Sequence, residues 1–196
     1  MAISKAKIGG GSLLCLTFCS FLLGQERHQQ RLDKSCQEFV STFYTWYLGE
    51  AVVGVPGEAT SDLALKDRPY VFSSDLYRQL SEDSEAQRKA PGELVGLDFD
   101  PFIGPDGPAE RYIVEKVTTR DGRCWAEVHA AWNGIKNAAT DVTPEPELVF
   151  KGGRWIFVNF HYHDPARPGQ PFDLLTELKE LRKSREQEKA MRGKKP

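Results

Sequence analysis

Polar residues that could bind a ligand or move a proton occur in two segments with strand-like alternation. Side chains two apart on a strand face the same way, so neighbouring strands would place such residues on one surface. An apolar surface with a few convergent polar groups is typical of a small-molecule site, and a histidine beside a carboxylate could act as an acid/base pair. The same pattern fits the solvent-facing side of a half-buried sheet. The candidate ligand-binding residues are Trp125, Glu127, His129, Trp155, Asn159 and His161.

A metal site is the second possibility, because His161 and His163 also lie two apart. Asp164 or Glu127 could add a further ligand. A third ligand at a motif-defined spacing is missing, so we expect surface or hydrogen-bonding histidines and predict no metal and no cofactor.

The segment Asp98-Phe99-Asp100-Pro101-Phe102 holds acids that could bind calcium. It lacks the twelve-residue EF-hand spacing and its closing glutamate. We therefore expect Asp98 and Asp100 to bond the backbone of a turn, while Phe99 and Phe102 anchor the loop to the core. The chain also lacks a Gly-rich phosphate loop, a Gly-x-Ser-x-Gly motif and a zinc-ribbon spacing. No catalytic residue is predicted.

The N-terminal segment is typical of a secretory signal. Residues 1–24 contain no acid, and Lys5 and Lys7 precede an apolar stretch. Small residues are poorly placed for cleavage, so an uncleaved membrane tether is an alternative. We expect an exported protein: periplasmic, secreted or membrane-tethered. Residues 25–32 are polar and predict a flexible leader. The net charge of -2 argues against a general nucleic-acid binder.

The cysteines divide into two groups. Cys15 and Cys19 lie in the predicted signal, which leaves Cys36 and Cys124 in the rest of the chain. Two cysteines in an exported chain favour a disulfide. Two free buried thiols are the alternative.

Residues 33–181 predict a single α+β domain. Aromatic and aliphatic residues recur every three or four positions from Asp33, which predicts a helix that ends at Gly49. Helices are also expected from Ser73 and from Phe172. Strands at 111–120 and 124–132 flank the turn Asp121-Gly122, and 147–163 form a second hairpin around Gly152-Gly153. The pattern indicates N-terminal helices packed on a curved, mainly antiparallel four-stranded sheet, with a C-terminal helix and a basic, disordered tail at 182–196.

In the last strand, side-chain alternation predicts two faces. One face carries Ile156, Val158, Phe160 and Tyr162. The other carries Trp155, Phe157, Asn159, His161 and His163.

The chain resembles a bacterial exported family catalogued as domain of unknown function 3828. The resemblance spans roughly Lys34 to Leu181. Its motifs are Phe39-x3-Phe43-Tyr44-x-Trp46-Tyr47-Leu48, Asp98-Phe99-Asp100-Pro101-Phe102, Gly153-x-Trp155-Ile156 and Leu174-Leu175. It implies a nuclear transport factor 2-like or cystatin-like fold, in which a curved antiparallel sheet wraps a long N-terminal helix. Some exported proteins similar to this family act as immunity proteins against secreted toxins.

Two functions follow as expectations. The first is an exported, non-catalytic module that binds an unknown protein partner, with an immunity-like role as one form of this function, or a small ligand. The second is a small enzyme of the cone-shaped α+β fold that uses His129 or His161 with Glu127 in a sheet cavity.

Overall fold

The computed structural model describes residues 13–53, 59–105, 107–133, 135–136, 143–163 and 172–192. For residues 13–26, 51–53, 136 and 143 it describes the backbone alone. Of the predicted signal at 1–24, residues 1–12 therefore lie outside the described residues. Across the described part of the chain, none of the helices has an apolar stretch that would cross a membrane.

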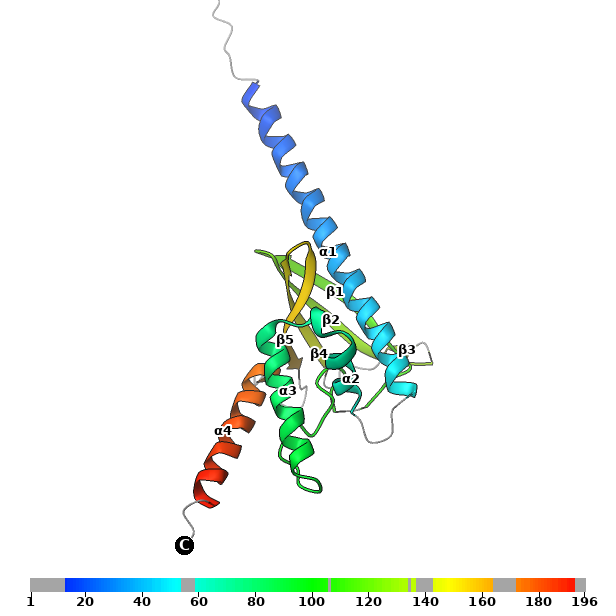
Figure 1. Cartoon of the computed structure of the whole chain (residues 1–196). Helices are drawn as coiled ribbons and strands as arrows, with labels where there is room; N and C mark the ends of the chain where they lie inside the picture. The colour runs from blue at the N-terminus through cyan, green and yellow to red at the C-terminus, as the bar shows by residue number, and fades with distance from the viewer. Residues whose placement is uncertain are drawn as a thin grey trace, which may run out of the picture.

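The fold is α+β, as predicted (Figure 1). Helices precede an antiparallel sheet, and one further helix follows it. The elements are α1 (Leu13–Val53), α2 (Thr60–Asp67), the 3-10 helix η1 (Pro69–Val71), α3 (Ser74–Lys89), β1 (Arg111–Arg120), β2 (Arg123–Trp132), β3 (Ile135–Lys136), β4 (Thr143–Lys151), β5 (Arg154–His163), β6 (Phe172–Asp173) and α4 (Leu174–Arg192).

The sheet is an antiparallel meander in the order β1-β2-β4-β5-β6, with β3 paired to β2. The four predicted strands are confirmed, and the two-residue strands β3 and β6 are additions. Asp121 and Gly122 both have positive φ, at 52° and 72°. Gly152 and Gly153 do too, at 60° and 79°. Positive φ at both central residues matches the twist of two-residue hairpins, so these dipeptides determine the strand pairing.

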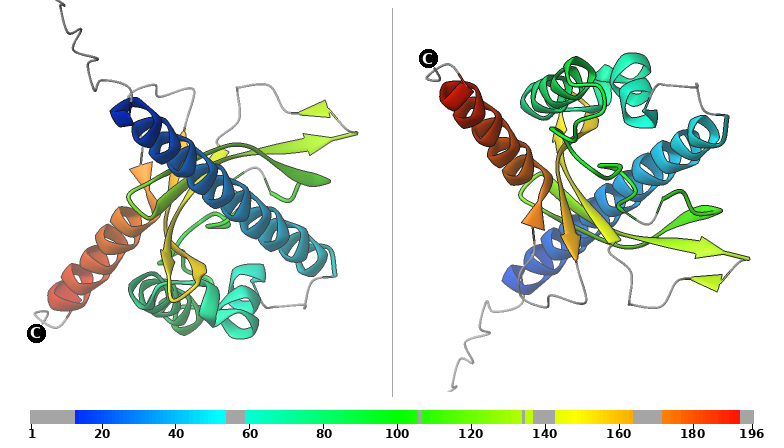
Figure 2. Two further views of the ribbon diagram at one scale, coloured as in Figure 1. Left: turned by 90° about the horizontal axis from the view of Figure 1, so that it is seen from above. Right: turned by 90° about the horizontal axis from the view of Figure 1, so that it is seen from below.

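The core lies between one face of the sheet and α1, which crosses the strands (Figure 2). The disulfide Cys36–Cys124 joins α1 to β2, and both cysteines are fully buried. Apolar side chains from α2, η1, α3 and α4 enter the same core. At the sheet edge, the Ser73 N–H donates to the Phe157 carbonyl at 2.8 Å. The aromatic residues of α1 thus build the core, as their spacing predicts.

A β-bulge reverses the faces of β5 halfway along the strand. Glu147 pairs with Asn159, but Leu148 pairs with Phe157, so β5 has one extra residue, Val158. An extra residue shifts the side-chain alternation by one. Trp155 and Phe157 point into the core before the bulge, and Phe160 and Tyr162 do so after it. The predicted faces of the last strand were therefore wrong beyond the bulge.

Helix α1 begins earlier and ends later than predicted. Residues 25–32 are helical, so the expected flexible leader is wrong. This segment is rich in Gln, Glu and Arg, which favour helix even where no apolar face exists. Hydrogen bonds also join this part of α1 to β1. Gln29 donates to the Thr119 carbonyl, and Asp33 accepts from the Thr119 N–H at 3.1 Å. Gly49 lies inside the helix and does not end it.

Helix α4 includes most of the segment that we expected to be a disordered tail. It continues to Arg192, and residues 193–196 lie outside the described part. The sequence pattern fails here because ion pairs replace apolar contacts after Leu181. Arg185 donates to Asp83 Oδ1 at 2.5 Å and to the Val95 carbonyl at 2.8 Å. Asp83, with 7% of its side chain exposed, also accepts from the Leu97 N–H at 2.9 Å.

Replacing this arginine, as Arg185→Ala, should lower the free energy of unfolding by about 1–3 kcal/mol, because it deprives a buried carboxylate of a partner. Urea unfolding checks this value. Arg182→Ala is the matched control, since Arg182 pairs with Glu82 at 3.5 Å where both side chains are 42% exposed. The control should cost less than about 0.5 kcal/mol. Equal losses for the two variants would contradict this role of Arg185.

Candidate functional site

The side of the sheet opposite the core carries mostly half-buried and exposed side chains, and we call it the outer face. It combines aliphatic and aromatic residues with carboxylates, histidines and an arginine. Its members include Ile113, Glu115, Lys116, Thr118, Arg123, Trp125, Glu127, His129, Glu145, Glu147, Val149, Ile156, Val158, Asn159, His161 and His163.

One group of polar side chains on the outer face centres on His129. Its Nε2 lies 2.8 Å from Glu127 Oε1 and 3.4 Å from Glu115 Oε2. The His129 side chain is 14% exposed, while both glutamates are about half exposed. A bulge in β1 inserts Glu115 between Val114, which pairs with Val128, and Lys116, which pairs with Glu127. Bulges re-aim side chains in this way, so Glu115 joins the two residues that the sequence predicted.

A second group centres on Glu147, whose side chain is only 12% exposed. His161 Nε2 lies 3.0 Å from Glu147 Oε2, and the Arg123 guanidinium bonds the other carboxylate oxygen. Trp125 pairs with Glu147 across β2 and β4, so the indole lies beside this group. The sequence prediction included Trp125 and His161 but missed Glu147, although Glu145-x-Glu147 has the period of a strand face.

Trp155 does not belong to the outer face, so the prediction of one six-residue surface was wrong for this residue. Trp155 is 3% exposed in the core, and its Nε1 donates to Ser35 Oγ at 3.0 Å. Asn159 lies at the bulge, where its Nδ2 donates to Asp173 Oδ1 at 2.9 Å and its Oδ1 accepts from the Leu175 N–H at 3.1 Å. Asn159 thus joins β5 to the start of α4.

Asp173 completes this junction as the cap of α4. Its Oδ1 accepts from the Thr176 N–H at 3.0 Å, and its Oδ2 accepts from the Thr176 hydroxyl at 2.8 Å. Burial opposes ionisation of Asp173, but the hydrogen bonds from Asn159 and Thr176 outweigh it and lower the pKa of the carboxyl. These bonds are structural, which explains why Asn159 is buried.

The predicted metal pair of His161 and His163 is divided between two carboxylates. His161 contacts Glu147, whereas His163 Nε2 lies 3.0 Å from Glu145 Oε2 at the end of the strand. Asp164 lies outside the described residues. The strand spacing therefore places the two histidines on one face without giving them a common ligand set in the described contacts.

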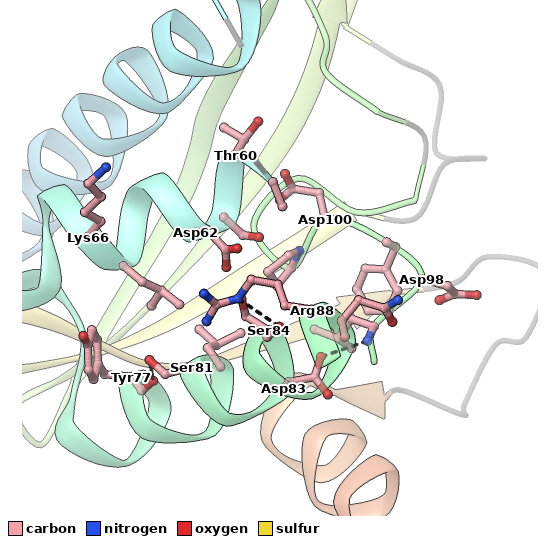
Figure 3. A pocket seen from close by; sticks show the side chains of 18 of the residues that line it. Thr60, Asp62, Lys66, Tyr77, Ser81, Asp83, Ser84, Arg88, Asp98 and Asp100 are labelled. Atoms are coloured by element: carbon pink, nitrogen blue, oxygen red, sulfur yellow. Dashed lines mark hydrogen bonds between the residues drawn. The ribbon is translucent and has the colours of Figure 1, made fainter. Parts of the chain in front are cut away.

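A groove of about 1140 Å³ lies away from the outer face, between α2, α3 and the loop at 94–101 (Figure 3). Its polar lining includes Asp62, Lys66, Ser84 and Arg88, and none of the six predicted residues lines it. The sequence did not predict the groove, because it depends on how α2 and α3 pack against a loop.

In the acidic loop beside the groove, Asp100 makes the turn that we predicted for Asp98 and Asp100, whereas the described hydrogen bonds include none to the Asp98 carboxylate. Asp100 Oδ1 accepts from the Phe102 N–H at 2.9 Å, and Oδ2 accepts from the Tyr47 hydroxyl at 2.6 Å. Burial raises the pKa of the Asp100 carboxyl despite these bonds. Phe102 is fully buried, and Phe99 packs on Tyr162. Both phenylalanines thus anchor the loop to the core, as predicted.

The outer face carries five of the six predicted residues, namely Trp125, Glu127, His129, Asn159 and His161, although Asn159 is buried there by its bonds to Asp173 and Leu175. The His129–Glu127 distance suits proton transfer, yet the pair lies on an open sheet face. Comparisons with protein-family models, with curated proteins and with solved structures gave no match. The geometry of the outer face therefore carries the functional argument.

Proposed function

We propose that this protein is an exported, non-catalytic binding module whose outer face binds a protein partner. The observation that supports this most is the composition of the outer face. Trp125 pairs with Thr118 on β1 and with Glu147 on β4. The same face carries histidines, glutamates and Arg123 together with the aliphatic residues Ile113, Val149, Ile156 and Val158. Aromatic side chains and arginine are enriched in protein interfaces, where polar groups surround an apolar centre.

Export is part of this proposal. The disulfide between Cys36 and Cys124 fits an oxidising compartment, because thiols of cytosolic proteins are generally kept reduced. The basic and apolar N-terminal residues support a signal or a membrane tether. Membership of the domain of unknown function 3828 family, with its nuclear transport factor 2-like fold, is also a proposal. The immunity-like role is a proposal that depends on this resemblance.

An enzyme is the second candidate, and one observation favours it. His129 Nε2 and Glu127 Oε1 are within hydrogen-bond distance, as an acid/base pair requires. Catalysis of this kind usually takes place in a pocket that excludes water. The large groove lies elsewhere and includes neither residue. The open position of the pair therefore favours binding over catalysis.

The experiment compares partner capture by three forms of the protein from the envelope fraction of its own source. We expect the wild type to retain one stoichiometric protein. Trp125→Ala should weaken that capture about thirtyfold, because truncation of a central interface tryptophan costs about 2 kcal/mol or more. Tyr77→Ala is the matched control: Tyr77 is an exposed aromatic residue that lines the groove. Thermal melts establish that both variants fold.

The outcomes separate the candidate surfaces. Loss of capture in Trp125→Ala alone supports the outer face. Loss in Tyr77→Ala alone overturns the proposal and assigns binding to the groove. A wild type that retains no protein contradicts a protein partner, and a thermal-shift screen of metabolites then tests the small-ligand form.

A further inference from the structure

We propose that Glu115, Glu127 and His129 form a binding site for a first-row divalent cation, with Zn²⁺ as its best probe. These residues offer one imidazole nitrogen and two carboxylate oxygens, all within 4.8 Å of one another. They lie on neighbouring strands of the outer face. The sequence pattern predicted no metal site, because only the β1 bulge brings Glu115 to the other two residues.

The distances suit a common ion. Zinc binds histidine nitrogen and carboxylate oxygen at about 2.0–2.2 Å, which separates two ligands of a tetrahedral site by about 3.4 Å. His129 Nε2 lies 2.8 Å from Glu127 Oε1 and 3.4 Å from Glu115 Oε2. Rotation of the half-exposed glutamates can adjust both distances, since neither carboxylate is enclosed by the core.

The chemistry of the ligand set selects the class of cation. An imidazole suits zinc and its first-row neighbours, whereas magnesium and calcium prefer oxygen ligands throughout. Two carboxylates with a neutral imidazole carry a charge of -2, which balances a divalent ion. With three protein ligands, the fourth position of a tetrahedral ion would be open to solvent, as in zinc sites that bind a further group.

The other histidine–glutamate pairs of the outer face lack this set. His161 contacts Glu147, but that carboxylate also binds the Arg123 guanidinium, whose positive charge opposes a cation. His163 contacts Glu145 at the exposed end of the strand. His161 therefore provides an internal control on the same face, with the same kind of partner.

The test is calorimetric titration of the untagged, chelator-treated protein with Zn²⁺. We expect one equivalent to bind and Mg²⁺ to bind far more weakly. His129→Gln and Glu115→Gln should each weaken Zn²⁺ binding by about tenfold or more, because even the loss of a residue that only orients a metal ligand typically costs about that factor. His161→Gln should change the affinity by less than about twofold. Melting curves without metal establish that each variant folds. If His129→Gln does not fold, Glu115→Gln provides the test, because Glu115 is half exposed.

Two results would overturn the site. One is a wild type that binds no Zn²⁺ with one-to-one stoichiometry. The other is a His161→Gln variant that weakens binding as much as His129→Gln does, since this would assign the ion to scattered surface histidines. Partner capture can succeed or fail independently of both results, because the titration uses the metal alone.

Discussion

Replacing both disulfide cysteines, as Cys36→Ala with Cys124→Ala, is expected to lower the free energy of unfolding by about 2–5 kcal/mol. The bond spans a sequence separation of 88 residues, and it connects the long helix α1 to the central strand β2. In the chain-entropy model, a cross-link over so long a loop removes much of the freedom of the unfolded chain. Denaturant unfolding in the absence of reductant gives the value.

The wild type and the double cysteine variant, each measured with and without reductant, provide the control. Reductant should lower the stability of the wild type toward that of the double variant, and it should leave the variant unchanged. The variant also controls for any effect of reductant on Cys15 and Cys19. A wild type that unfolds at the same denaturant concentration with and without reductant would contradict a stabilising disulfide.

Truncation of the central core ring, as Phe43→Ala, should lower the free energy of unfolding by about 3–5 kcal/mol. Phe43 is 2% exposed, and its ring centroid lies 4.8 Å from that of Phe157 on β5 and 5.6 Å from that of Phe102. The cavity would open between α1, the sheet and the loop after α3, where three segments meet. None of these segments can move inward without losing its own contacts.

The adjacent residue provides the matched control for this variant. Thr42 is exposed on α1, and its hydroxyl donates to the Glu38 carbonyl of its own helix. Thr42→Ala should change the stability by less than about 0.5 kcal/mol. Urea unfolding of the two variants measures the difference between the buried and the exposed side of α1. A loss below about 1 kcal/mol for Phe43→Ala would mean that this ring is not central to the core.

Local sequence patterns predicted those elements that depend on turn residues or on apolar contacts with the core. Two-residue turns with positive φ fixed both hairpins, and the three-to-four spacing of aromatic residues gave the buried side of α1. The patterns failed where an element is held by other contacts. Ion pairs such as Arg185–Asp83 extend α4 beyond its apolar stripe.

Strand β4 shows a similar limit. We expected this hairpin to begin at residue 147, but the strand begins at Thr143 and includes Pro144 and Pro146. Proline lacks the N–H that a central strand needs. Here the prolines pair with β5, while the pairing of β4 with β2 begins only at Glu147. Among the described strands, the first half of β4 is thus paired on one side only, which allows the two prolines. The sequence pattern does not reveal this one-sided pairing.

The candidate site was predictable up to the bulges. Alternation on β2 placed Trp125, Glu127 and His129 together, as observed. On β5, one extra residue moved Trp155 to the opposite face from His161. The β1 bulge added Glu115, and strand register added Glu147. A bulge leaves no distinct signal in residue type, so these corrections required the structure.

Site-specific photo-crosslinking tests most directly whether the outer face is the binding surface. A photoreactive phenylalanine analogue is incorporated at position 125 on β2 or, as a control, at position 45. Thr45 lies on the exposed side of α1, and its hydroxyl donates only to the Ser41 carbonyl among the described contacts. We predict one crosslinked protein from position 125, and none from position 45, after irradiation in the envelope fraction. Crosslinking of that protein from position 45 but not from position 125 would contradict the proposed function.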